Sequence, residues 1–160
     1  MLNKLNVTTP SDLEIVLTRD FNAPRQLVWE AMSKPDLIQR WLQGPPGWEM
    51  VLCEDDLRAG GSFRWAWRGA DGAEMAMHGI YQEVVPPERI VRTETFDFGC
   101  DAQSGEQQVT LTLTDHGDKT SLKLRLLYPS REARDGAIAS GMERGVSASY
   151  DRLEEMLASA

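Results

Sequence analysis

Charged residues on predicted strands are the first candidates for chemistry in this chain. Arg92 and Glu94 are two residues apart, so both side chains fall on one face of a strand, and Arg64 lies on an earlier strand. A charge buried beside a ligand needs a partner or a polar ligand group. Facing inward, Glu94 could act as a general acid or base, whereas facing outward the three residues would form surface cross-strand pairs.

The two histidines are weaker candidates for catalysis or metal binding. His78 has the opposite strand parity from Met77 and Tyr81, so it is predicted to face the other side of the sheet unless a bulge at Gly79 turns it. As a catalytic base it would also need a second group to orient it. His116 lies in a predicted turn and is expected to be solvated. Two histidines so far apart in the sequence do not indicate a metal site.

Nucleophile and metal motifs are missing from the sequence. Ser62 lacks the Gly-x-Ser-x-Gly setting of a nucleophile elbow. Cys53 and Cys100 belong to no Cys-x-x-Cys pair, and Cys100 lies in a predicted loop without an obvious histidine partner. The acidic run 54–56 is interpreted as a solvated edge, because three adjacent carboxylates on one strand cannot all converge on a cation. We therefore predict no catalytic residue, no metal site and no cofactor.

Composition narrows the choice of partners. The 17 basic and 25 acidic residues give a formal charge of -8, and no basic run occurs, so nucleic acid and anionic membranes are not expected partners. The first residues hold no apolar leader segment, and no stretch approaches the roughly 18 apolar residues of a membrane span. With two isolated thiols, the sequence predicts a cytoplasmic protein without membrane insertion.

The periodicity of apolar residues predicts the elements that would position these side chains. Alternation typical of a strand covers 13–21, and two short helices follow within 24–42, separated at Pro35. Further strands are marked by turn residues, above all the hairpin pair at 71–72. Their approximate ranges are 48–52, 63–68, 74–85, 90–96, 109–113 and 122–128.

A long helix is predicted from Pro129 to the end of the chain. Its apolar stripe recurs every three or four residues and consists of Ile138, Met142, Val146, Tyr150, Leu153 and Leu157. Gly136, Gly141 and Gly145 each cost about 1 kcal/mol relative to Ala in a helix interior. The first half is therefore predicted to be looser than 147–157, or not fully helical.

The order of these elements predicts an α+β domain. A run of hairpin-linked strands between helices favours a curved antiparallel sheet of about six to seven strands, wrapped around the long C-terminal helix, with two short helices after the first strand. Residues 1–160 are interpreted as a single domain, in which residues 1–10 form a flexible N-terminal lead.

Several motifs resemble those of one protein family. They are Arg19-x-Phe21-x-Ala23-Pro24-x-x-x-Val28-Trp29, Gly44-Pro45-x-Gly47, Asp56-x-Arg58-x-Gly60-Gly61 and Gly79-x-Tyr81-x-Glu83-Val84-x-Pro86-Pro87. The resemblance, from about Leu13 to Leu157, is to proteins like the activator of the ninety-kilodalton heat-shock chaperone's ATPase. That family belongs to the START-like (SRPBCC, Bet v1-like) superfamily, and the resemblance implies a helix-grip fold.

The resemblance also implies a cavity between the concave sheet face and the C-terminal helix. Mapped onto this sequence, its candidate ligand-binding residues are Trp41, Trp48, Phe63, Trp65, Met75, Met77, Tyr81, Glu94, Phe96, Met142, Val146 and Tyr150. Aromatic and methionine side chains suit an apolar ligand, although the same residues could fill a solid core. Where the family often carries Gly-Trp in the last helix, this chain has Gly145-Val146 or Gly141-Met142.

Three functions follow from these observations. The first is binding of a small hydrophobic, aromatic or amphipathic ligand. The second is an enzyme resembling polyketide cyclases, with Glu94, Arg92 or His78 assisting proton transfer. The third is an accessory domain that acts on a chaperone partner through its surface. We prefer the first because the sequence has no nucleophile, metal motif or phosphate loop. A homodimer through an exposed edge strand or through residues 24–42 stays open.

Overall fold

An antiparallel sheet forms the largest part of the molecule. The computed structural model describes residues 3–44, 46–97 and 106–159, so Cys100 and most of the loop predicted at 97–105 lie outside the described residues. The eight described strands form one sheet in the order β1-β2-β8-β7-β6-β5-β4-β3. Their bounds are β1 (Asn6–Thr8), β2 (Glu14–Phe21), β3 (Trp48–Asp55), β4 (Ser62–Gly69), β5 (Glu74–Val85), β6 (Arg89–Asp97), β7 (Glu106–Asp115) and β8 (Thr120–Leu127).

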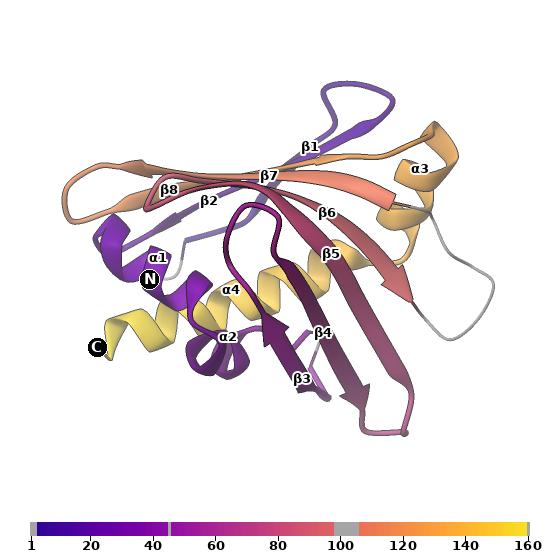
Figure 1. Cartoon of the computed structure of the whole chain (residues 1–160), viewed down its shortest axis with the longest axis horizontal. Helices are drawn as coiled ribbons and strands as arrows, with labels where there is room; N and C mark the ends of the chain where they lie inside the picture. The colour runs from indigo at the N-terminus through magenta and orange to yellow at the C-terminus, as the bar shows by residue number, and fades with distance from the viewer. Residues whose placement is uncertain (1–2, 45, 98–105, 160) are drawn as a thin grey trace.

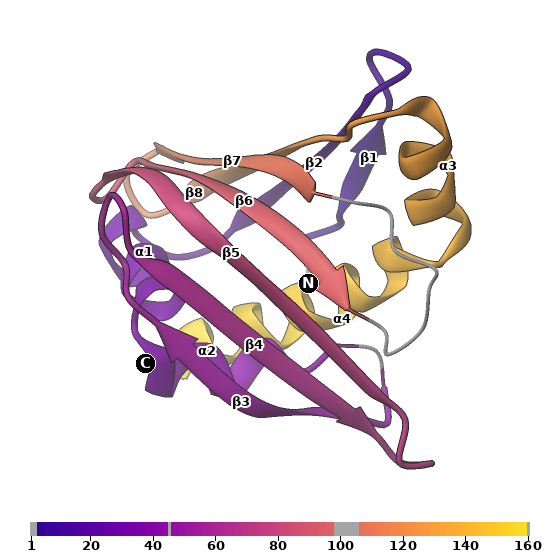
Figure 2. The ribbon, with the colours of Figure 1, turned by 45° about the vertical axis from the view of Figure 1, so that its right-hand side comes forward.

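Helices cover the concave side of this sheet. The sheet arches over α4 (Met142–Ala158), and α1 (Arg25–Ser33) and α2 (Pro35–Trp41) lie towards the C-terminal end of α4 (Figures 1 and 2). None of the helices in the described part of the chain is long and apolar enough to cross a membrane. The predicted α+β architecture, with two short helices after a strand and a C-terminal helix gripped by the sheet, is confirmed.

Alternating residues explain why one face of the sheet is apolar. In the β7–β8 pair, Leu111 lies opposite Leu124 and Leu113 opposite Leu122, and all four side chains are buried. Burying each such leucine contributes about 2 kcal/mol of hydrophobic stabilisation. On β4 the pattern is similar, because Phe63, Trp65 and Trp67 are buried while Arg64 and Arg68 are exposed. The sheet therefore presents a mainly apolar surface to the helices.

The first residues differ from the predicted flexible lead. Asn6–Thr8 form β1, an edge strand in which Val7 lies opposite Leu17 of β2. The Asn3 side chain also donates a hydrogen bond to Glu154 of α4, at 2.8 Å. Pairing with β2 satisfies backbone groups that a free lead would leave to water. A three-residue strand has too little alternation to be recognised in the sequence, and it raises the strand number from the predicted six or seven to eight.

The predicted long helix is divided into two. The first part is α3 (Arg131–Ala139), whose Ser130 cap accepts a hydrogen bond from the Ala133 amide. The chain then turns at Gly141, which has a φ of +79°, and continues as α4. A left-handed conformation suits glycine because it has no Cβ. The predicted loosening of the first half is therefore located at Ser140 and Gly141.

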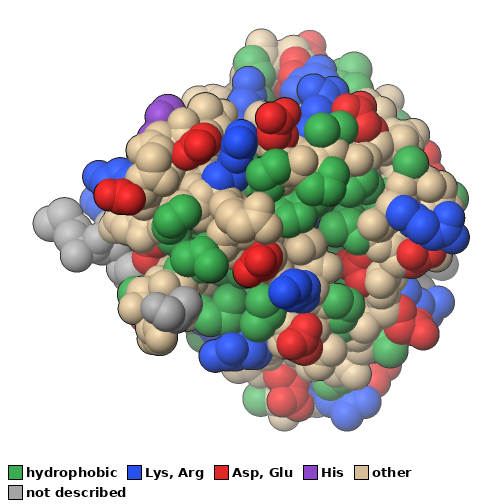
Figure 3. All heavy atoms as spheres, turned by 60° about the vertical axis from the view of Figure 1, so that its left-hand side comes forward, with side chains coloured by type: hydrophobic (Ala, Val, Ile, Leu, Met, Phe, Trp, Pro, Cys, Tyr) green, Lys and Arg blue, Asp and Glu red, His purple; other side chains and the backbone are tan. Residues whose placement is uncertain are grey.

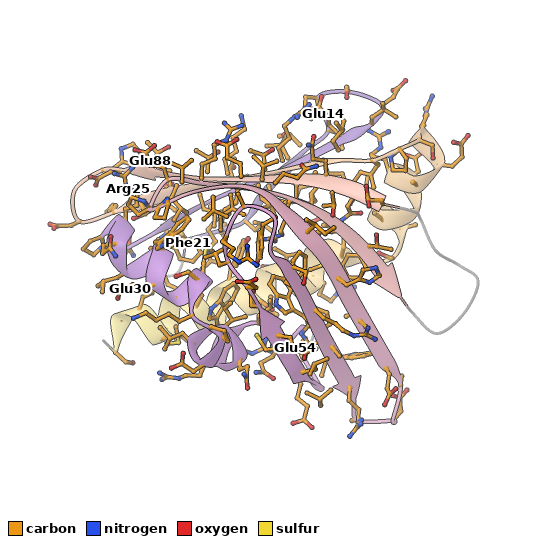
Figure 4. The ribbon with its side chains drawn as sticks, in the orientation of Figure 1. Glu14, Phe21, Arg25, Glu30, Glu54 and Glu88 are labelled. Carbon is orange, nitrogen blue, oxygen red and sulfur yellow. The ribbon has the colours of Figure 1, made fainter. Side chains whose placement is uncertain are left out.

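Aromatic contacts and an ion pair fix α1 and α2 against the sheet and α4. The Trp41 indole donates a hydrogen bond to the Ala31 carbonyl at 2.9 Å, and its ring lies 5.9 Å from Tyr150. At the start of α1, Arg25 lies 3.9 Å from Glu88 of the β5–β6 turn, and Figure 4 places the two side chains beside each other. These contacts hold the helix pair over one end of the concave sheet face.

Candidate functional site

A cavity of about 820 Å³ lies between the sheet, α2, α3 and α4. Its sheet wall comes from β4 to β8, and its opposite wall comes from these three helices together with Met32 of α1. A volume of this order is in the range of small-molecule sites, which are mostly apolar with a few polar groups. The curved sheet leaves this space because register shifts on β3 and β5, between Met50 and Leu52 and between Tyr81 and Glu83, bend it.

Nine of the twelve residues predicted to bind a ligand line this cavity. The aromatic members are Trp41, Trp65, Phe96 and Tyr150. The remaining members are Met75, Met77, Glu94, Met142 and Val146. They come from α2, β4, β5, β6 and α4, so the fold brings together residues more than a hundred positions apart in the sequence.

Trp48, Phe63 and Tyr81 do not line the cavity. The Phe63 ring packs on Tyr81 at 5.3 Å, and the guanidinium of Arg92 covers it at 5.5 Å. Tyr81 directs its hydroxyl to Asp55, 2.7 Å away. Trp48 lies opposite Gly69 at the end of the β3–β4 pair, with its ring in the space that a Gly69 side chain would need. The structure therefore does not place these three among the lining residues, because their rings pack against neighbouring residues.

Arg92 and Glu94 form a polar cluster on the sheet wall. The Arg92 guanidinium lies 2.8 Å from Glu94 Oε2, through both Nε and Nη2. The Gln107 amide donates to Glu94 Oε1 at 3.0 Å. Glu94 is buried, with 4% of its surface exposed, and all three residues line the cavity. The sequence left open whether Arg92 and Glu94 face inward or outward, and in the structure both face inward.

The Arg92 guanidinium is held in its charged form. It lies 5.3 Å from the centre of the Trp65 ring, which is a favourable cation–π distance. Burial acts to lower the pKa of Arg92, but the Glu94 carboxylate more than offsets this effect, and the pKa is raised. A buried charge with a hydrogen-bonded partner of opposite sign avoids most of the cost of desolvation.

Two tyrosine hydroxyls contribute to the polar part of the cavity. Burial raises the pKa of Tyr150 to about 12, and the nearby Glu94 carboxylate acts in the same direction. Burial also raises the pKa of Tyr128, again with a contribution from Glu94. Both phenols therefore stay protonated at neutral pH. Tyr128 and Gln107 were missed as cavity residues, although Tyr128 shares strand parity with Leu124 and Leu126.

Asp55 departs from the solvated edge predicted for 54–56. Its carboxylate accepts hydrogen bonds from the Tyr81 hydroxyl at 2.7 Å and from the Trp65 indole at 3.2 Å. Burial raises the pKa of Asp55 despite these two hydrogen bonds. Its neighbours Glu54 and Asp56 are exposed, as expected for an edge strand. Strand alternation alone explains the difference, since Asp55 has the inward parity of Cys53.

Several lining residues could have been found from the sequence, and others could not. Trp67 follows Trp65 at strand spacing, and Leu111, Leu124 and Leu126 belong to the clearest alternating strands. By contrast, the small residues of the helical wall recur at helical spacing, but small side chains alone do not indicate that a helix face lines a cavity. These are Gly136, Ala137, Ser140, Gly141, Gly145 and Ser149.

The remaining chemical candidates lie away from the cavity. His78 and Arg64 face each other on the exposed side of the β4–β5 pair. Ser62 and His116 are exposed. Burial raises the pKa of Cys53 to about 11, which keeps the thiol protonated at neutral pH. Across residues 3–44, 46–97 and 106–159, no group of three His, Cys, Asp or Glu side chains could hold a metal ion.

The burial of a second arginine, Arg19, was not predicted, although the residue belongs to a motif that carries the family resemblance. The Arg19 side chain on β2 is fully buried and lies 2.7 Å from Asp151 of α4. Its guanidinium also lies 5.3 Å from the Phe21 ring, which Figure 4 shows on the concave side of the sheet. Arg19 does not line the cavity, and we interpret the Arg19–Asp151 pair as a link between sheet and helix.

A curved antiparallel sheet that grips a C-terminal helix and encloses a cavity defines the helix-grip class of the SRPBCC, Bet v1-like superfamily. Within it, residues 22–158 match the family described as activator of Hsp90 ATPase homolog 1-like protein, and this chain belongs to that family. The family resemblance seen in the sequence motifs is therefore confirmed. No curated protein matches the sequence.

Solved bacterial structures share the fold over nearly the whole chain. A protein from Rhodobacter sphaeroides is 30% identical, with a TM-score of 0.90 over 98% of this chain and 99% of that one. A protein from Chromobacterium violaceum is 28% identical, with a TM-score of 0.78 over 92% and 98%. The AHSA1 protein from Silicibacter pomeroyi is 20% identical, with a TM-score of 0.74 over 91% and 97%.

Proposed function

We propose that this protein binds a small hydrophobic or amphipathic molecule in the cavity between the sheet and α4. The observation that carries the proposal is the cavity itself, about 820 Å³ of space behind mainly apolar walls. A close-packed interior contains few voids larger than a water molecule, so a space of this size favours an occupant. The aromatic and methionine side chains on its walls provide large, adaptable contact areas.

The polar cluster supports binding more than catalysis. Both oxygens of Glu94 already accept hydrogen bonds, one from Arg92 and one from Gln107. A carboxylate engaged in this way is poorly placed to take up or release a substrate proton, because each transfer would break an ion pair in a buried site. His78, the other candidate base, is exposed on the opposite side of the sheet.

The alternative of action through the surface has weaker support. On the face shown in Figure 3, hydrophobic side chains gather near the centre, with acidic and basic side chains around and between them. Such a mixed surface is common on soluble proteins, and larger uninterrupted apolar patches are what mark partner sites. The cavity is the more specific feature.

The proposal is tested with a matched pair of tryptophan variants. Native mass spectrometry of the purified protein would identify a bound small molecule, and a thermal-shift screen of aromatic and lipid-like compounds would find stabilising ligands. At a ligand concentration of about 100 times Kd, binding adds about 2.7 kcal/mol. For a chain of this length, that raises Tm by roughly 5–10 °C.

Val146→Trp places a large side chain in the cavity, because Val146 lines it from α4. We expect this variant to lose the ligand-dependent rise in Tm. Ile80→Trp adds the same side chain on β5 at a position that is 53% exposed, and should keep the rise. If no compound stabilises the protein and nothing co-purifies, or if both variants respond equally, the cavity is not the binding site.

A further inference from the structure

The charges of the Arg92–Glu94 cluster on the sheet wall of the cavity are already balanced. The Arg92 guanidinium lies 2.8 Å from the Glu94 carboxylate, and Gln107 occupies the second Glu94 oxygen. Asp55 also attracts Arg92 electrostatically, and this attraction partly opposes the rise in the pKa of Asp55 that burial causes. The cluster therefore offers no unbalanced positive charge to an incoming ligand.

The cavity nevertheless has hydrogen-bond donors without partners. Tyr128 and Tyr150 both line it, and neither hydroxyl makes a hydrogen bond within the part of the chain that the structure describes. Neither oxygen is among the described buried polar atoms that are sealed off without a partner, so both reach open space. The raised pKa values of both phenols keep their protons in place. A ligand acceptor can replace water at these donors, and each such hydrogen bond contributes about 0.5–1.5 kcal/mol net.

These two observations constrain the ligand's polar group. A carboxylate would be desolvated beside Glu94, with an Arg92 that is already paired, and an amine would be desolvated beside Arg92. An uncharged oxygen avoids both costs and can still accept hydrogen bonds from the tyrosines. The formal charge of -8 on the whole chain also disfavours anions.

Building on the ligand-binding function proposed above, we infer that the cavity selects an uncharged carbonyl compound, with an apolar and preferably aromatic body. The carbonyl oxygen accepts hydrogen bonds from the hydroxyls of Tyr128 and Tyr150. The body packs against the tryptophans and methionines of the remaining wall, represented by Trp41, Trp65 and Met77.

The test compares three naphthalenes substituted at the same ring position. Acetylnaphthalene carries the carbonyl, ethylnaphthalene lacks the oxygen, and naphthoate carries a charge. Each displaces Nile red, an uncharged dye whose fluorescence rises in apolar sites, from the full chain. We expect acetylnaphthalene to bind at least about tenfold more tightly than either of the others, as one or two buried hydrogen bonds would give.

Variants assign the preference to particular hydroxyls. In Tyr128→Phe/Tyr150→Phe, acetylnaphthalene should lose its advantage over ethylnaphthalene, while the affinity for ethylnaphthalene stays within about twofold. Tyr81→Phe is the matched control, because the Tyr81 hydroxyl donates to Asp55 and Tyr81 does not line the cavity. It should keep the tenfold preference. Since the double variant retains both rings, a loss of folding would be seen separately by circular dichroism.

The possible outcomes separate the two proposals. Naphthoate or ethylnaphthalene binding as tightly as acetylnaphthalene would overturn the carbonyl inference and leave ligand binding intact. An unchanged preference in the double tyrosine variant would overturn it as well. If Nile red and all three naphthalenes fail to bind, both the inference and the proposed function fail.

Discussion

Gly79 on β5 is the glycine at which an added Cβ should lower the stability of the fold most. The residue is buried and faces inward, opposite Phe63 of β4. A Cβ at this position would overlap the Thr93 carbonyl oxygen and lie 2.9 Å from the Phe63 ring. Since backbone atoms cannot rotate away as a side chain can, β5 and β6 would have to separate.

Overpacking of a core costs about 1–3 kcal/mol, and a clash with backbone belongs at the upper end. Gly79→Ala should therefore lower the free energy of unfolding by about 3 kcal/mol, and Tm by roughly 6–12 °C. The measurement is urea unfolding followed by tryptophan fluorescence, in which the midpoint should fall with little change in slope.

Gly136→Ala is the matched control for this experiment. Nothing lies within 4 Å of a Cβ added at Gly136, which is inside α3. This variant should gain about 1 kcal/mol because alanine favours the helix over glycine. If Gly79→Ala lowers the free energy of unfolding by less than about 1 kcal/mol, or if the two substitutions have equal effects, the close approach of β5 and β6 at Gly79 is refuted.

Two further predictions follow from raised pKa values. Because burial raises the pKa of Asp55, the folded protein binds a proton at Asp55 more readily than the unfolded chain does. The stability of the wild type relative to Asp55→Asn should therefore fall as pH rises above about 3.8. Parallel curves of stability against pH for the two proteins would contradict this. Burial raises the pKa of Cys53 to about 11, so iodoacetamide at pH 8 should alkylate Cys53 much more slowly in the folded protein than in the urea-unfolded chain. Peptide mapping distinguishes alkylation of Cys53 from that of Cys100. Equal rates in the folded and unfolded chains would show that the Cys53 thiol is not desolvated.

The strands were predictable where one face is apolar and the other polar. The alternation of Leu122, Leu124 and Leu126 fixed both the strand and its buried face, since a one-residue slip would expose all three. β6 was harder because Ile90 and Val91 are both buried, so neither parity identifies the inner face. The inward direction of Arg92 and Glu94 therefore became clear only in the assembled sheet.

The cavity was only partly predictable, for a different reason. Strand parity tells which side chains share a face of the sheet, and Trp65 and Met77, which the family resemblance suggested, do line the cavity. It cannot tell which inward side chains are covered by others. Phe63 and Tyr81 have the same parity as these two residues, yet they pack against each other beneath Arg92. That outcome depends on ring positions between strands, which no single-strand pattern contains.

If the cavity binds a ligand as proposed, the break between α3 and α4 has a consequence for the speed of ligand exchange. α3 provides part of the cavity wall, but it is joined to α4 through Gly141 and buries only Ala133. Its other attachments include the Ser130 cap and a hydrogen bond from Arg134 to the Ser11 carbonyl at 2.7 Å. Segments with little buried surface open at lower free energy than the core. Under the proposed function, opening of α3 would govern residence time. Substitutions at α3 positions that do not line the cavity would then change on- and off-rates together while leaving Kd nearly constant.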